Sequence, residues 1–156
     1  MEPTFDLATI TQSLAPADIR RGILAFEDWL RQFPPGEAPV THHFASGIYG
    51  REMLIPQGTV LTGKIHKGEC LNIVSKGKIR VLTEHGLRTI EAPATFVSPP
   101  GVKRVGLALE DTIWTCIHPN PEDETDLGAL EARLVAPDYD ALHDAQQKME
   151  TLGGEA

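Results

Sequence analysis

The feature that most constrains the fold is a series of short β-type runs between about Val40 and Asn120. Each run is rich in β-branched or aromatic residues, and turns that contain glycine or proline separate the runs. The runs cover residues 59–62, 71–74, 78–83, 87–90, 95–97 and 112–117. Many short strands at regular spacing are typical of an antiparallel sandwich or barrel. We therefore expect one antiparallel β-barrel over residues 40–120, with Gly58, Gly77 and Gly101 in turns.

Helical patterns flank this region on both sides. Before it, an apolar stripe recurs at helical spacing between Pro16 and the Pro-Pro-Gly breaker at 34–36, which predicts one amphipathic helix. The stripe consists of Ile19, Ile23, Phe26, Leu30 and Phe33. Its apolar face either packs on the barrel or forms a dimer contact. After the barrel, spaced leucines predict a short helix that begins near Thr125-Asp126, and residues 139–152 form a second helical stretch.

These patterns divide the chain into three parts. We expect an N-terminal segment with the amphipathic helix over residues 1–36, a β-barrel over 37–120, and an acidic helical tail over 121–156. The tail alone accounts for the net charge of −8, since only Arg133 and Lys148 oppose its ten acids.

Composition and charge exclude several classes of protein. The chain has 156 residues, of which 41% are apolar, so it is long enough for one domain with a core. An acidic chain without a basic stripe is not expected to bind nucleic acids in general, because phosphate contacts supply most of that affinity. No apolar run approaches the ~20 residues of a membrane span, and the first residues do not form a signal peptide. Because Cys70 and Cys116 form no disulfide framework, we expect a cytoplasmic protein without membrane contact.

The stretch from Gly58 to Gly77 resembles the first motif of cupins. That motif places a His-x-His pair and a glutamate between two glycines. Both glycines and the spacings are present, and His66 matches the second histidine, but Lys64 replaces the first histidine and Cys70 replaces the glutamate. A fainter second motif has Pro-Pro-Gly at 99–101 for its turn and Arg104 in place of its histidine. The resemblance implies a mainly β protein with a single cupin-type antiparallel β-barrel, or jelly roll.

A longer stretch, from about His43 to Leu134, is similar to small cupin-like proteins of tailed bacteriophages, which are generally of unknown function. The similarity rests on four short segments, at residues 96–98, 103–105, 110–114 and 123–127. It implies a protein of the host cytoplasm or of the virion. It implies no activity, because cupins range from oxygenases to seed storage proteins.

The replaced residues argue against the usual cupin metal centre. Lysine and arginine are cationic and poor ligands, so of the four positions only His66 and Cys70 could bind a metal. Two donors do not hold a catalytic Fe or Mn, and a soft Cys–His pair suits Zn better. We therefore expect no cofactor, with Zn or another divalent metal on His66 and Cys70 as the alternative. Nothing in the spacing places a third ligand beside them: the candidates are His118, His42 and His43, and the adjacent pair 42–43 is more typical of a surface.

The same replacements suggest an anion site. If Lys64 and His66 lie on one strand, alternation directs both into the barrel, where Arg104 would approach from the opposite side. Two fixed cations and an imidazole would bind a phosphate or carboxylate, most tightly when His66 is protonated, near or below pH ~6.5. An inward Lys64 would also need a ligand or an internal acid such as Glu69. The alternative is a twisted or bulged strand, with Lys64 and Arg104 in solvent.

Three functions therefore remain open, in this order. The first is a cupin-like protein, without catalytic residues, that binds a small anionic molecule such as a nucleotide or sugar phosphate through Lys64, His66 and Arg104. The second is a structural barrel that forms a homodimer or larger homo-oligomer through its N-terminal helix, in or on a virion. The third is a metal-dependent isomerase or oxygenase.

Overall fold

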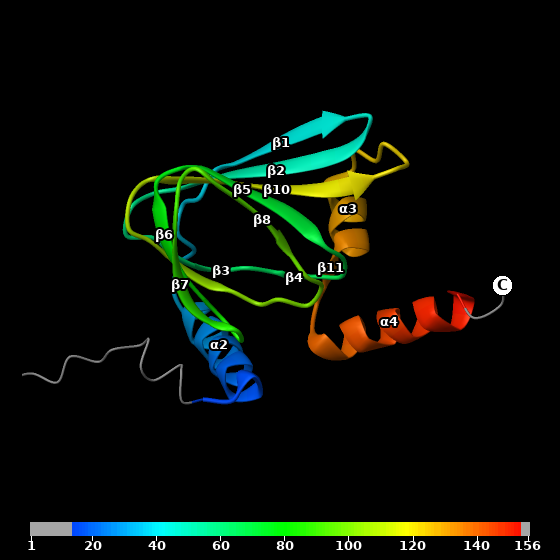
Figure 1. Ribbon diagram of the computed structural model, residues 1–156, viewed down its shortest axis with the longest axis horizontal. Coiled ribbons are helices and arrows are strands. Elements are labelled where there is room, and N and C mark those ends of the chain that lie inside the picture. Colours follow the sequence, from blue (N-terminus) through cyan, green and yellow to red (C-terminus); the bar gives the residue numbers. More distant parts are fainter. Residues whose placement is uncertain (1–13, 154–156) are drawn as a thin grey trace, which may run out of the picture.

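Two antiparallel sheets face each other in the computed structural model, which describes residues 14–153 (Figure 1). The larger sheet has the strand order β1-β2-β10-β5-β8, and the smaller has the order β3-β9-β6-β7. Their bounds are β1 Val40–Ala45, β2 Gly47–Ile55, β3 Val60–Thr62, β5 Cys70–Lys76, β6 Lys78–Thr83, β7 Gly86–Glu91, β8 Ala94–Ser98, β9 Val105–Ala108 and β10 Thr112–Asn120. All pairings are antiparallel, and this jelly-roll arrangement confirms the predicted fold class.

The six predicted runs are all strands, and the sequence singled out neither β1, β2 nor β9. The reason is visible on β2, whose inward positions include Tyr49 and Arg51 as well as Met53 and Ile55. Polar side chains at inward positions break the apolar alternation on which a strand prediction depends. Strands β1 and β2 nevertheless complete the larger sheet, in which β2 lies between β1 and β10.

Gly58, Gly77 and Gly101 lie in turns, as predicted, and all have positive φ. Gly77 joins β5 to β6 with φ 85°. A Cβ at this position would lie far inside contact distance of the Asp111 carbonyl oxygen and 2.7 Å from the Thr112 hydroxyl. At Gly58, by contrast, φ is 82° but a Cβ would meet open space. The turn at Gly77 therefore requires glycine for both its backbone conformation and its packing, whereas the turn at Gly58 requires it for its backbone conformation alone.

The main hydrophobic core fills one end of the space between the sheets. Val74 and Ile79 are at most 1% exposed, and Trp114 packs with them. The remaining buried members of this cluster are Ile55, Val81, Ile90 and Ala108. Burying an isoleucine or valine side chain stabilises the fold by about 1.5–3 kcal/mol, so this cluster is a major source of stability.

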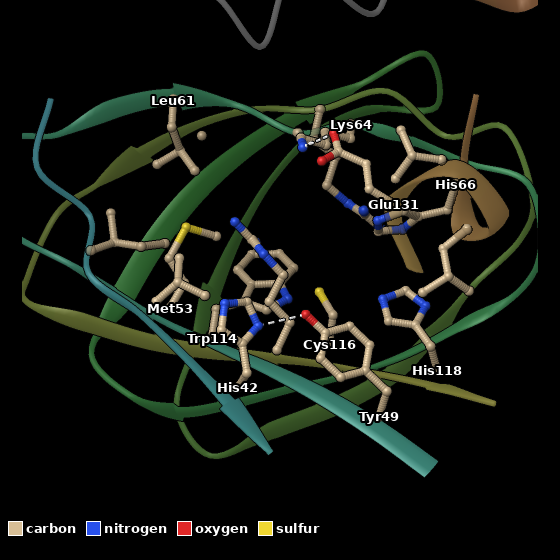
Figure 2. A pocket seen from close by; sticks show the side chains of 18 of the residues that line it. His42, Tyr49, Met53, Leu61, Lys64, His66, Trp114, Cys116, His118 and Glu131 are labelled. Atoms are coloured by element: carbon tan, nitrogen blue, oxygen red, sulfur yellow. Dashed lines mark hydrogen bonds and ion pairs between the residues drawn. The ribbon is translucent and has the colours of Figure 1, made fainter. Parts of the chain in front are cut away.

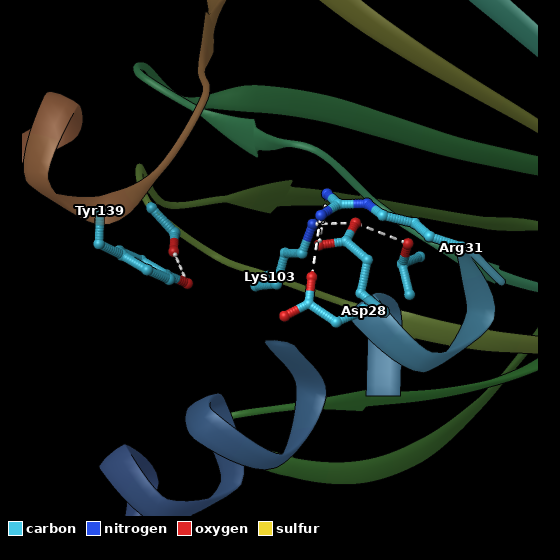
Figure 3. A network of polar contacts seen from close by, with 7 residues as sticks. Asp28, Arg31, Lys103 and Tyr139 are labelled. Atoms are coloured by element: carbon cyan, nitrogen blue, oxygen red, sulfur yellow. Dashed lines mark hydrogen bonds and ion pairs between the residues drawn. The ribbon is translucent and has the colours of Figure 1, made fainter. Parts of the chain in front are cut away.

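Helix α2 (Pro16–Leu30) docks on the barrel through its first apolar positions and through one buried ion pair. Ile19 and Ile23 are buried, so this half of the predicted stripe packs on its own chain. Glu27 accepts hydrogen bonds from Lys103 at 2.6 Å and from Thr62 at 2.8 Å (Figure 3). Burial raises the pKa of Glu27, but the hydrogen bonds from Lys103 and Thr62 outweigh it, so the net pKa is lowered.

The C-terminal segment contributes two helices and a short strand. Asp126 caps α3 (Leu127–Leu134) by accepting a hydrogen bond from the Ala129 amide at 2.8 Å, which confirms the predicted start. Strand β11 (Val135–Ala136) pairs with β4 (Ile65–His66). Helix α4 (Tyr139–Gly153) follows and buries Leu142 against Ile65 and Ala136. None of the described helices is long and apolar enough to cross a membrane.

Candidate ligand-binding site

A cavity of about 310 Å³ lies between the two sheets, and α3 covers its mouth (Figure 2). Inward side chains of both sheets form its walls, and Leu127, Leu130 and Glu131 of α3 line the mouth. Such a volume lies at the lower limit of small-molecule pockets. The structure therefore contains an interior cavity with room for a small molecule.

The register of β2 and β10 arranges the cavity wall in layers that change from polar to apolar. Tyr49 lies opposite His118, Arg51 opposite Cys116, and Met53 opposite Trp114. We call the side defined by Tyr49, Arg51, His66, Arg104, Cys116 and His118 the polar end. The apolar end is defined by Met53, Ile55, Leu61, Ile79 and Val81. Figure 2 shows Met53 and Leu61 on one side of Trp114, with Tyr49, Cys116 and His118 on the other.

Two guanidinium groups line the polar end. Arg104 precedes β9 and enters the cavity as predicted, where it donates a hydrogen bond to the Ser98 hydroxyl and lies 5.7 Å from the centre of the Trp114 ring. Burial lowers the pKa of Arg104, although its guanidinium remains charged. Arg51 comes from the middle of β2, and its side chain makes no hydrogen bond or ion pair within residues 14–153. The cavity therefore has two cations without a carboxylate partner.

Lys64 lies at the rim of the cavity. Strand β4 comprises only residues 65–66, so Lys64 precedes the strand and strand alternation does not direct its side chain inward. Its side chain is 54% exposed and forms an ion pair with Glu131 of α3. The internal acid that the sequence suggested, Glu69, is exposed instead. The Lys64–Glu131 pair adds no net charge to the cavity, so the second fixed cation of the polar end is Arg51 and not Lys64.

His66 lies in the cavity wall, and His118 packs against it with ring centroids 4.8 Å apart. Burial, the charge of His118 and that of Arg104 lower the pKa of His66 to about 4. Burial and the charge of Arg51 lower the pKa of His118 to about 4. Both imidazoles are therefore neutral near pH 7, in contrast to the protonated His66 that the sequence suggested for anion binding.

A possible metal-ligand cluster forms at the same place. Donor atoms of His66, Cys70 and His118 all lie within 4.8 Å of one another. His118 is the third ligand that the spacing alone could not place, and it comes from β10, 48 residues after Cys70. Its position opposite Cys70 follows from the pairing of β10 with β5.

Asn72 fixes the side chains between the two ends. Its amide oxygen accepts a hydrogen bond from the Trp114 indole at 3.0 Å and a weak one from the Cys116 thiol at 3.5 Å. Its amide nitrogen donates to Ser98 Oγ at 2.6 Å, and Ser98 also accepts from Arg104. The neighbouring Cys116 thiol together with burial raises the pKa of Cys70. Neither thiol forms a disulfide.

Sequence reasoning missed Tyr49 and Arg51 as cavity residues, and it named His118 and His42 only as candidates for a third metal ligand. His42 is not part of a surface pair: its Nδ1 lies 2.7 Å from the Tyr49 hydroxyl in the cavity wall, whereas His43 is exposed beside Glu52. A signal was present in the alternation of β2, where Tyr49, Arg51, Met53 and Ile55 share one face. It could be used only once β2 was recognised as a strand.

No family model and no curated protein matches the chain. Solved structures are similar in fold. A cupin-2 domain containing protein from Shewanella frigidimarina is 16% identical, with TM-score 0.43, over 65% of this chain and 99% of that one. A cupin domain from Bordetella pertussis is 15% identical, with TM-score 0.45, over 56% and 98%. An acetylacetone dioxygenase from Acinetobacter johnsonii is 17% identical, with TM-score 0.46, over 60% and 74%. These similarities concern the fold alone.

Proposed function

We propose that the protein binds a small phosphate- or carboxylate-bearing anion in its cavity and does not act as an enzyme. The observation that carries this proposal is that Arg51 and Arg104 line an interior cavity and that neither has a carboxylate partner among residues 14–153. A charge away from water is costly unless it is paired, so an anion between the guanidiniums would offset that cost. The single acid in the lining, Glu131, already pairs with Lys64.

The roles of the cavity residues differ from those predicted from the sequence. Arg51 and Arg104 supply charge-assisted hydrogen bonds to the anion. His66 contributes a neutral N–H donor, and binding of an anion raises its pKa from about 4 because the negative charge favours the imidazolium. Lys64 attracts the anion at the mouth but is partly neutralised by Glu131.

Isothermal titration with inorganic phosphate and with acetate tests the proposal. Arg51→Met and Arg104→Met should each weaken binding by at least tenfold, since a charge-assisted contact contributes about 1.5–3 kcal/mol. Arg80→Met is the matched control, because Arg80 is exposed on β6 between the inward residues Ile79 and Val81. Affinity should also fall as salt rises. Unchanged affinity in both cavity variants would contradict the proposal.

A second candidate is a metal site on His66, Cys70 and His118. The positions of the usual cupin ligands do not fit iron or manganese, because Lys64 and Arg104 occupy two of them. The three remaining donors, two neutral imidazoles and a soft sulfur, fit Zn²⁺ with an open position. A bound Zn²⁺ would act as a Lewis acid, as a metal-dependent enzyme requires. Competition with a zinc indicator tests this: His118→Gln should lose the zinc and the exposed His143→Gln should keep it.

We further propose that the protein self-associates through the exposed part of α2 and its C-terminal end, where Trp29 and Phe33 are each 51% exposed. Their rings pack against each other with centroids 4.8 Å apart, next to the half-buried Phe26. Large exposed aromatic patches commonly mark contact surfaces. A monomer by light scattering at micromolar concentration would contradict this proposal. A phage origin and a place in the host cytoplasm or the virion stay predictions from the sequence.

A further inference from the structure

We propose that the ligand is an amphipathic anion, with a carboxylate or phosphate head at the polar end and an aliphatic or aromatic body in the apolar end. This inference rests on the anion binding proposed above and names the class of anion. It follows from three properties of the cavity: the chemistry of its two ends, the place where its charges meet, and its size.

The side chains of the apolar end provide no hydrogen-bond partner for a polar group. Its side chains are Met53, Ile55, Leu61, Ile79 and Val81, and none of them can donate or accept a hydrogen bond of ordinary strength. Trp114 borders this end, but its one N–H already donates to Asn72. A hydroxyl group bound here would lose its bonds to water without replacement, which is costly. An alkyl or aryl group would instead bury apolar surface favourably.

The positive charges of Arg51 and Arg104 lie close together, where the polar end borders the apolar end. Arg51 lies opposite Cys116 in the register of β2 and β10, the guanidinium of Arg104 lies 5.7 Å from the centre of the neighbouring Trp114 ring, and both arginines line the cavity. Arg104 is fixed there by its bond to Ser98, which Asn72 in turn positions. A head group placed between the guanidiniums would have Trp114 and Met53 as its next neighbours toward the interior, since these two residues form the next layer of the wall. The body of the ligand therefore extends into the apolar end.

The size of the cavity limits the ligand. At about 30 Å³ per non-hydrogen atom, the share of liquid volume that one water occupies, 310 Å³ holds roughly ten atoms. A nucleotide is about twice that size. A sugar phosphate would fit by size, but its hydroxyl groups would face the apolar end. Six- to eight-carbon carboxylates and alkyl phosphates satisfy both conditions.

Titration with matched probes tests this class. Hexanoate should bind at least tenfold more tightly than acetate, and hexyl phosphate at least tenfold more tightly than inorganic phosphate or ribose 5-phosphate. Hexanol, which has the body without the charge, should bind at least tenfold more weakly than hexanoate. Each comparison changes one end of the ligand while the other end stays the same.

Two leucines of neighbouring strands give a matched pair of variants. Leu61→Trp fills the apolar end and should weaken hexanoate at least tenfold while acetate is unchanged, because the head group site stays intact. Leu107→Trp is the control, since Leu107 is exposed on the outer face of β9. Thermal unfolding of both variants verifies that they fold. Should Leu61→Trp unfold, Val81→Leu replaces it as a milder way of filling the same end.

The outcomes separate this inference from the proposed function. If ribose 5-phosphate binds as tightly as hexyl phosphate, the amphipathic class is wrong and anion binding stands. Equal affinity for hexanol and hexanoate would contradict anion binding itself. Both proposals are wrong if none of the probes binds at millimolar concentration.

Discussion

The two ends of the space between the sheets are built from the same strands and differ in almost every physical property. Toward the ends of β2 and β10 that contain Ile55 and Thr112, inward residues are apolar or small and closely packed. Toward the ends that contain Tyr49 and His118, they are aromatic, cationic or sulfur-bearing, and they surround the polar part of a cavity. Successive inward positions on one strand, two residues apart, thus pass from core to candidate site.

This difference separates the packed core from the candidate binding site within one fold. The packed end stabilises the sheets through close packing, and three of its side chains, Ile55, Ile79 and Val81, also form the apolar wall of the cavity. The polar end brings together Arg51, Arg104, His66 and His118 at some cost in stability, because it concentrates positive and titratable groups away from water. We expect substitutions at the packed end to change stability most, and substitutions at the polar end to change affinity most.

The largest effect on stability is expected at the turn of the packed end. Gly77→Ala should destabilise the fold by about 3–5 kcal/mol, because φ is positive and the new Cβ would collide with the Asp111 backbone. Gly58→Ala is the matched control with the same sign of φ and open space, and it should cost only about 1–2 kcal/mol. Urea unfolding measures both values. Equal costs would show that the contact at Asp111 contributes nothing.

A direct comparison of the two ends should give the next largest effect. Ile90→Ala in the packed cluster should lower the free energy of unfolding by about 2–4 kcal/mol through the lost burial and the remaining void. Arg51→Met at the polar end should change it by less than about 1 kcal/mol in either direction, because it removes an unpaired charge and keeps most of the side-chain volume. The same urea titration distinguishes them. A larger loss for Arg51→Met than for Ile90→Ala would reverse our assignment of the two ends.

The polar end should also make stability depend on pH. Since His66 and His118 have a pKa of about 4 in the folded protein and an ordinary value of 6.5, the unfolded chain binds more protons between these values. The contribution of the two histidines is therefore complete above pH 6.5 and is lost as pH falls toward 4, by up to about 3 kcal/mol for each histidine. Unfolding measured across this window should show a shallower decline in the double variant His66→Gln/His118→Gln. The exposed His143→Gln should behave like the original protein.

The smallest effect is expected at the rim of the cavity. Lys64→Met breaks the ion pair with Glu131, but both side chains are more than half exposed, so the cost in stability should be below about 1 kcal/mol. Lys103→Met breaks the ion pair with Glu27, in which the lysine side chain is only 6% exposed. This change should cost more stability, because the Glu27 carboxylate loses its shortest hydrogen bond. Thermal unfolding compares the two. A greater loss at Lys64 would mean that the pair at the mouth contributes more to stability than its exposure implies.

Most of the fold could be predicted from the sequence, because local signals and the final structure agree there. The run that contains Ile79 and Val81 is apolar at its inward positions and lies between the turn glycines Gly77 and Gly86, so it could be recognised as a strand. The cap at Asp126 and the end of α3 before Pro137 follow from the side chains alone. β2 could not be recognised, because its inward positions serve the cavity as well as the core.

The candidate site could be predicted only in part, for the same reason. Arg104 and His66 were found because the cupin-like motif places them, and both line the cavity. Lys64 was expected inside, but a strand of two residues leaves it at the rim. Arg51 and His118 depend on the pairing of β2, β10 and β5, which connects residues up to about 70 positions apart and is not visible in any local pattern.

Asn72 has a consequence for any attempt to tune this protein. Because the Trp114 indole can only donate, the amide of Asn72 must turn its oxygen toward Trp114 and its nitrogen toward Ser98. One amide plane thus determines the direction of a core aromatic ring and, through Ser98, that of Arg104. A screen that selects for heat resistance and a screen that selects for ligand affinity would therefore both return to position 72. Neither property could be improved there without changing the other.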